Sequence, residues 1–260
     1  MNIQITEDKF IPKLLVDICC NQDVNGEHRL LEQIIKESET ESVIFDVGAR
    51  NSKFPEYSNT HQFHLFDPTF IYEDGVNYDK PNVFINENAL NSTDYTIDNY
   101  CKINNIENIE YLKIDTDGYD IDVLKGAKKM IQQTKYIQIE HDIFHLFHKI
   151  NLDELYEILD GFNIYKITAF GLERVDKIKE NYIYSNYLFT KSEINYEPHV
   201  LDCDFFIKTF WESSPSEVTR WFNTTSGPFS YKENKNFDTT AFVSRYFSQY
   251  LPSFIDGLPT

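Results

Sequence analysis

The sequence predicts an α/β fold built on a doubly wound, mostly parallel sheet. Short continuous apolar runs alternate along residues 41–192 with segments whose apolar residues recur at helical spacing. Continuous apolar runs are typical of parallel strands that are covered on both faces. Strands that alternate with helices favour βαβ units, and hence a parallel sheet.

The core elements follow in order along the chain. The predicted strands are 43–45, 62–66, 82–85, 111–114 and 136–139. A helix with Ile121, Val123, Leu124 and Ala127 as its inner stripe follows the fourth strand. Another helix covers 152–159 and stops at Asp160-Gly161, a glycine C-cap signal. Two late strands, 164–170 and 182–190, are predicted to form an antiparallel hairpin at one sheet edge.

Three parts are expected. Residues 1–40 form an N-terminal helical cap, because apolar residues recur at helical spacing on both sides of Asn25-Gly26. Residues 41–192 form the Rossmann-like core. Residues 193–260 form an aromatic C-terminal extension that either closes over the site as a lid or joins two subunits.

Composition excludes some classes of protein. The formal net charge is -18, with 42 acidic against 24 basic residues and no Lys/Arg-rich run, which disfavours nucleic acid as the main substrate. The 4 cysteines contain no CxxC pair, which disfavours a disulfide scaffold or a zinc ribbon. With no secretory signal and no apolar stretch of roughly 18 residues, the sequence predicts a cytoplasmic protein without a membrane partner.

Acidic residues end four of the five predicted core strands. They are Asp46, Asp67, Asp115 and Glu140. In open α/β sheets, ligands bind at the carboxyl ends of the strands. We therefore expect the functional site at that edge.

The first two strand ends favour a nucleoside ligand. Gly48 lets the backbone approach a ligand, and Asp67 can accept hydrogen bonds from ribose hydroxyls. A dinucleotide site also needs G-x-G-x-x-G, of which only Gly48 is present. S-adenosylmethionine has no pyrophosphate, and its sulfonium and amino groups suit acidic strand ends. The alternative is a simple strand-turn-helix in which Asp46 caps the helix.

Six short blocks together resemble a known family. Besides Asp46-Val47-Gly48-Ala49 and Phe66-Asp67-Pro68, they are Thr96-Ile97-Asp98, residues 111–120 (YLKIDTDGYD), residues 123–127 (VLKGA) and Ile139-Glu140. The region 42–142 resembles the FkbM-type S-adenosylmethionine-dependent methyltransferases. The resemblance implies S-adenosylmethionine as cofactor and O-methylation as the reaction, often of sugars or polyketide-like natural products.

The chain departs from the family pattern at a few positions. Arg50-Asn51-Ser52 replaces the usual Asn and Gly after the first strand, and Asp67, Asp117 and Asp120 replace Glu. The candidate cofactor-binding residues are Asp46, Gly48, Ala49, Arg50, Asp67, Pro68, and Asn88 and Ala89 after the third strand.

Methyl transfer to a hydroxyl needs a group that removes the proton. His141 is the first candidate for this base, with Asp115, Lys113 and Glu140 as further catalytic candidates at the same edge. Alternatively, Asp115, Glu140 and His141 could bind Mg²⁺ or Mn²⁺. His141, His145 and His148 would share one helix face and are read as a polar rim.

The preferred acceptor is a sugar or nucleotide-linked sugar, by family analogy. Arg50 or Lys113 would then have to face its phosphates. Polyketide-like acceptors, N-methylation and carboxyl methylation stay open. Two further hypotheses belong to other functional classes. One is an NAD-dependent oxidoreductase, which the missing glycines of the G-x-G-x-x-G motif disfavour, and the other is a non-catalytic nucleoside-binding protein.

Overall fold

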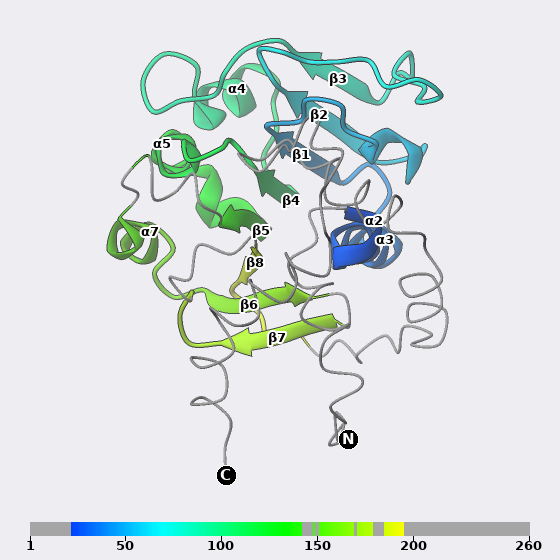
Figure 1. The fold of residues 1–260 in the computed structure, drawn as a ribbon. Coiled ribbons are helices and arrows are strands. Elements are labelled where there is room, and N and C mark those ends of the chain that lie inside the picture. The colour runs from blue at the N-terminus through cyan, green and yellow to red at the C-terminus, as the bar shows by residue number, and fades with distance from the viewer. Residues whose placement is uncertain (1–21, 142–147, 149–150, 169–170, 179–184, 195–260) are drawn as a thin grey trace, which may run out of the picture. The chain divides into compact units, whose positions relative to one another are not determined.

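A single sheet of eight strands organises the chain (Figure 1). The computed structural model describes residues 22–141, 148, 151–168, 171–178 and 185–194. The strand order is β3-β2-β1-β4-β5-β8-β6-β7. The first five strands in this order are parallel and the last three are antiparallel to their neighbours. The predicted Rossmann-like core is confirmed.

The parallel strands agree with the predicted runs, with shifts at their ends. Their bounds are β1 Val43–Val47, β2 Gln62–Phe66, β3 Val83–Asn86, β4 Ile109–Ile114 and β5 Thr134–His141. The central strands β1 and β4 are almost entirely buried, as expected of strands covered on both faces. The register places Asp46 beside Lys113, and Lys113 beside Gln138.

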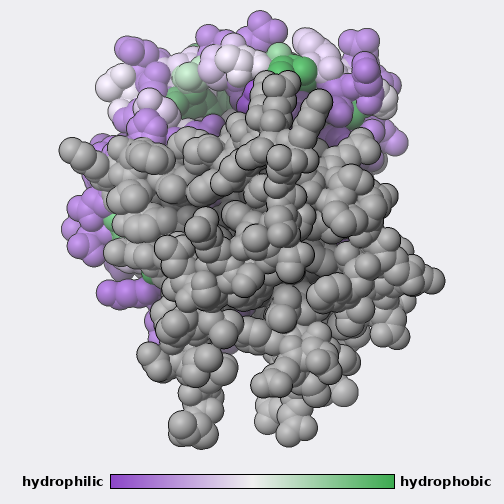
Figure 2. All heavy atoms as spheres, viewed as in Figure 1, coloured by the Kyte–Doolittle hydropathy of each residue, from purple (hydrophilic) through white to green (hydrophobic). Residues whose placement is uncertain are grey.

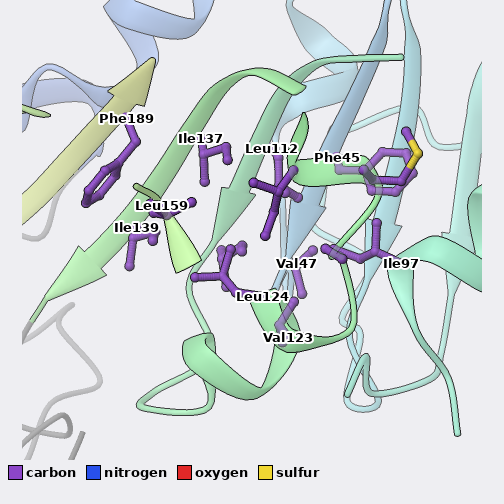
Figure 3. Close-up of a cluster of buried hydrophobic side chains, with 14 of the residues drawn as sticks. Phe45, Val47, Ile97, Leu112, Val123, Leu124, Ile137, Ile139, Leu159 and Phe189 are labelled. Carbon is purple, nitrogen blue, oxygen red and sulfur yellow. The ribbon is translucent and has the colours of Figure 1, made fainter. Parts of the chain in front are cut away.

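Helices cover both faces of the sheet. They are α2 Gln22–Asn25, α3 Glu27–Glu37, α4 Ile97–Ile103, α5 Asp120–Lys125 and α7 Leu152–Ile158, with 3-10 helices at Phe54–Glu56 and Met130–Gln133. Residues of α4, α5 and α7 pack on one face in a large apolar cluster (Figure 3). Leu30, Leu31 and Ile34 of α3 pack on the opposite face.

Asp46 does not cap a helix. It is the fourth residue of β1, and the stretch 48–61 between β1 and β2 contains the short 3-10 helix but no α-helix. The alternative of a simple strand-turn-helix with Asp46 as its cap is therefore wrong.

The late strands differ from the predicted hairpin. β6 (Asn163–Thr168) and β8 (Ser185–Thr190) are antiparallel neighbours, as expected, but β8 lies inside the sheet between β5 and β6. A further strand, β7 (Gly171–Val175), forms the tight hairpin with β6 and is the edge. β8 is buried along its whole length, whereas no residue of β7 is buried, and this difference agrees with an inner strand and an edge strand.

Several predictions fall outside the described residues. They concern the first part of the helical cap, His145, and the aromatic extension from residue 195 onward. No helix in the described ranges is long and apolar enough to cross a membrane. Figure 2 shows a largely hydrophilic described surface, with small hydrophobic areas toward the end of the sheet that carries β3 and α4.

Candidate cofactor site at the carboxyl ends of the strands

The turn after β1 is closed against both neighbouring strands. The backbone N–H groups of Gly48 and Ala49 donate to the carbonyl of Phe66 at 2.9 and 3.1 Å. Gly48 has a φ of 83°, and a Cβ added there would lie 1.7 Å from the carbonyl oxygen of Asp115. The glycine is therefore required by the approach of the β4 end, a reason different from the predicted approach of a ligand.

Asp67 shapes the loops around this turn. Its Oδ2 accepts a hydrogen bond from the Arg50 N–H at 3.0 Å, and its Oδ1 accepts from the N–H and hydroxyl of Thr69 at 2.6 and 2.7 Å. A carboxylate oxygen has two lone pairs, so hydrogen bonds from a ribose remain compatible with these contacts. Pro68, Asn88 and Ala89 are exposed near the ends of β2 and β3.

The loops that follow β1 and β2 are tied together. Arg50 accepts a hydrogen bond from Ile71 N–H at 2.6 Å, and the Tyr78 hydroxyl donates to the Ser52 carbonyl at 2.8 Å. Arg50 has a φ of 28°, a conformation that favours Asn over most other residues. The usual Asn of the family pattern at this position therefore suits the backbone better than the arginine found here.

Three predicted site residues form a buried charged cluster. The Lys113 ammonium lies 2.7 Å from Asp115 Oδ2 and 3.8 Å from Asp46 Oδ1. Only 4% of the Lys113 and Asp46 side chains is exposed, against 23% for Asp115. Because Asp46 and Lys113 are register partners and Asp115 lies two residues after Lys113, all three side chains share the α3 face.

Burial and charge shift the pKa values of this cluster. Burial raises the pKa of Asp46, and the Lys113 ammonium offsets part of that rise. Burial alone would lower the pKa of Lys113, but Asp115, Asp46 and Glu27 outweigh it and raise that pKa well above its ordinary value. Lys113 is therefore a permanent cation at working pH.

Sequence reasoning missed the polar network beside this cluster. Glu27, the first residue of α3, accepts hydrogen bonds from Asn25, Gln138 and Asn186 at 2.6, 2.6 and 3.0 Å. Gln138 also donates to Asn186 and accepts from the Tyr111 hydroxyl. Gln138 interrupts the apolar run of β5, and that break was the available signal.

The last two residues of β5 point to opposite faces. β5 extends through His141, two residues beyond its predicted end, so Glu140 lies on the face of Gln138 and His141 on the face of Ile139. His141 is 2% exposed, with its ring 6.5 Å from that of Tyr187. Its role as a base stays a prediction.

The alternation of side chains also bears on the predicted metal site. Asp115 and Glu140 share one face of the sheet, whereas His141 lies on the other. Within the described part of the chain, no three His, Cys, Asp or Glu side chains are grouped closely enough to hold a metal ion. The structure therefore does not support a Mg²⁺ or Mn²⁺ site at Asp115, Glu140 and His141.

A comparison with models of known protein families assigns this chain to a family. The model of the methyltransferase FkbM domain matches residues 24–164. This chain belongs to the FkbM methyltransferase family. The match starts within α2, so the FkbM region includes Glu27, whereas the sequence resemblance started at residue 42. Family membership implies S-adenosylmethionine as the methyl donor.

Other comparisons give weaker likenesses. Among curated proteins, none matches this FkbM chain. A TehB-like SAM-dependent methyltransferase from Corynebacterium glutamicum is 13% identical, with 62% of this chain and 87% of that one covered and a TM-score of 0.39. The METTL16 methyltransferase domain is 10% identical, with 64% of this chain and 66% of that one covered and a TM-score of 0.39. An uncharacterized protein from Listeria monocytogenes serotype 4b is 11% identical, with 86% of this chain and 96% of that one covered and a TM-score of 0.34.

The loop after β4 carries the acidic residues of the FkbM pattern. Asp120 is 1% exposed, and its carboxylate accepts hydrogen bonds from the N–H groups of Thr116 and Gly118 at 3.4 and 3.3 Å. This carboxylate therefore shapes the loop. His148, one member of the predicted polar rim, is exposed and lies against Tyr119 of this loop, with ring centroids 4.8 Å apart.

An open groove lies at the opposite, amino-terminal edge of the sheet. Its lining includes Ser42, Gln62, Glu110 and Lys135, which stand at or beside the starts of strands. The FkbM motif residues Asp46, Gly48, Asp67 and Asp115 all lie at the other edge. The groove is thus separate from the candidate cofactor site.

Proposed function

We propose that this FkbM protein transfers a methyl group from S-adenosylmethionine to a hydroxyl of a small substrate. The proposed acceptor is a sugar or nucleotide-linked sugar used in glycan or polysaccharide biosynthesis. The observation that carries the proposal is the set of carboxylates at the carboxyl ends of three adjacent strands, the buried Asp46 and Asp67 and the partly exposed Asp115. The choice of a sugar rests on the family resemblance.

The residues present suit this cofactor. Asp46 Oδ1 is buried beside the glycine turn and accepts no hydrogen bond from any described residue. A buried carboxylate oxygen without a donor is costly, so a cationic or N–H donor group of a ligand would stabilise it. When bound, S-adenosylmethionine supplies a methyl group on a positively charged sulfur.

Asp115 is the proposed acceptor-facing carboxylate. Its side chain is 23% exposed, and Lys113 holds it through one oxygen at 2.7 Å. This partly exposed carboxylate is the group that could accept the proton of a hydroxyl. His141, the first candidate from the sequence, would need the acceptor to reach a ring that is 2% exposed.

Thermal unfolding with added ligands tests the cofactor. S-adenosylmethionine and S-adenosylhomocysteine at about 100 times their dissociation constants should each stabilise the fold by roughly 2.7 kcal/mol, a rise of a few degrees in Tm. NAD should give no shift. A shift with NAD alone would favour the oxidoreductase reading, and no shift with either adenosyl ligand in folded protein would overturn the proposed function.

Methyl-labelled S-adenosylmethionine then tests the acceptor class. The protein is incubated with nucleotide-linked sugars, simple glycosides, phenolic polyketide mimics, amines and carboxylic acids, and labelled products are separated. We expect label in a base-stable ether of a sugar. A base-labile product would indicate a methyl ester instead, and label confined to the phenols or amines would exclude the sugar.

A further inference from the structure

We propose that Lys113 sets the net charge of the cofactor site and so limits its preference for S-adenosylmethionine over S-adenosylhomocysteine. The two ligands differ at sulfur, which is cationic in the first and neutral in the second. The inference rests on the proposed function, and it assigns to Lys113 a role in ligand selection rather than in contacting an anionic acceptor.

Burial and pairing keep Lys113 away from any ligand. Its side chain is 4% exposed, and its ammonium is 2.7 Å from Asp115 Oδ2. A lysine is almost never buried to this extent unless it is paired with acids. A nucleotide phosphate could not reach this ammonium without breaking the pair, so the lysine acts on ligands through its charge.

The carboxylates around this lysine outnumber it. Asp46, Asp115 and Glu27 all interact electrostatically with Lys113. Three side-chain amides donate hydrogen bonds to Glu27. Among the described residues, the only cation within 4 Å of Asp46 is Lys113, at 3.8 Å. Removing the ammonium would therefore make the cluster more negative by one charge.

The loss of this positive charge must change the binding of a nearby cationic sulfur more than the binding of a neutral one. Charges in a buried cluster are screened much less than charges on the surface. Contacts that the two ligands share cancel in the ratio of their dissociation constants. That ratio therefore reports the electrostatic effect of the cluster on the charged sulfur.

The experiment measures both dissociation constants by calorimetry for the full chain and for Lys113→Met, Asp115→Asn and the double variant. Lys113→Met should shift the ratio toward S-adenosylmethionine by about tenfold, the effect expected for one unit charge in such a site. Asp115→Asn should shift it by a similar factor toward S-adenosylhomocysteine. The double variant restores the net charge and should return the ratio to within about threefold of wild type.

Lys135→Met is the matched control, because Lys135 is half-exposed and pairs with Glu110 at the opposite edge of the sheet. Its ratio should equal that of wild type. If wild type binds neither ligand, the proposed function fails. If wild type binds both but folded Lys113→Met leaves the ratio within twofold, the inference is overturned. If Lys113→Met does not fold, Asp115→Asn takes its place. A ratio within twofold of wild type in that variant then overturns the inference.

Discussion

Gly48 lies where the ends of β1, β2 and β4 meet. Its N–H donates to the carbonyl of Phe66, and Asp115 N–H donates to the carbonyl of Val47, so backbone hydrogen bonds fix the turn from both sides. The space that a side chain would need is filled by the Asp115 carbonyl. One missing Cβ thus brings two candidate acids, Asp46 and Asp115, onto adjacent strand ends.

Gly48→Ala should lower the free energy of unfolding by about 3 kcal/mol or more. The added Cβ would overlap a backbone oxygen and would also force alanine to a φ of 83°. Urea denaturation measures the loss. Gly75→Ala is the matched control, since Gly75 has a φ of 90° but nothing within 4 Å of its Cβ position. We expect the control to lose only about 1 kcal/mol. Equal losses would show that the clash with Asp115 is relieved at no cost.

The sequence was informative about single residues at the strand ends. Asp46, Gly48 and Asp67 could be placed there because an apolar run stops at each. The ion pair of Lys113 with Asp46 could not be predicted, because it depends on the register between two strands. Glu140 and His141 were predicted to lie together because the predicted strand ended at residue 139. β5 extends through His141, so the two side chains point to opposite faces of the sheet.

At the level of elements, His64 joins β2 to its neighbours. Its Nδ1 lies 2.8 Å from the hydroxyl of Tyr100 on α4, and its ring stacks on Phe84 of β3 with centroids 4.6 Å apart. Its Nε2 has no hydrogen-bond partner among the described residues. Burial lowers the pKa of His64 to about 4. The neutral ring is therefore part of the packing between strand and helix.

His64 should make the fold sensitive to mild acid. The unfolded histidine binds a proton near pH 6.5 and the folded one near 4, so stability falls as pH drops from about 6.5 to 4. Between pH 7 and pH 5 this group should remove about 2 kcal/mol from the free energy of unfolding. The measurement is urea denaturation at both pH values for wild type and His64→Gln.

The His64→Gln variant should lose less stability than wild type between these two pH values, by about that amount. The control is His148→Gln, because His148 is exposed. Its loss between pH 7 and pH 5 should match that of wild type. A wild-type loss that His64→Gln leaves unchanged would contradict the assignment.

Elements were predictable where their apolar pattern is strong. The five parallel strands follow from short apolar runs. β7 was missed because residues 171–175 (GLERV) alternate weakly, and none of them is buried. Helix α4 begins at the capping residue Thr96, whose hydroxyl accepts from Asn99 N–H at 3.1 Å. From the sequence, we identified Thr96 only as part of a family motif and did not predict that it caps a helix.

At the level of the whole molecule, Glu27 connects parts that are distant in the sequence. Its carboxylate binds Gln138 of β5 and Asn186 of β8, which are 111 and 159 residues away. All three side chains are buried, at 0–3% exposure. The network thereby joins α3 to both the parallel and the antiparallel half of the sheet. No local sequence pattern can reveal contacts over such separations.

Glu27→Ala should therefore destabilise the whole fold, by about 3 kcal/mol. It leaves the amide donors of Asn25, Gln138 and Asn186 buried without their shared acceptor, and a buried donor without a partner costs about 1 kcal/mol or more. Glu37→Ala, at the other end of α3, removes one exposed hydrogen bond with Gln33 and should cost less than about 0.5 kcal/mol. Urea denaturation followed by far-UV and near-UV circular dichroism should show a single transition that shifts only in Glu27→Ala. Early loss of part of the signal in that variant would mean instead that α3 detaches while the sheet stays folded.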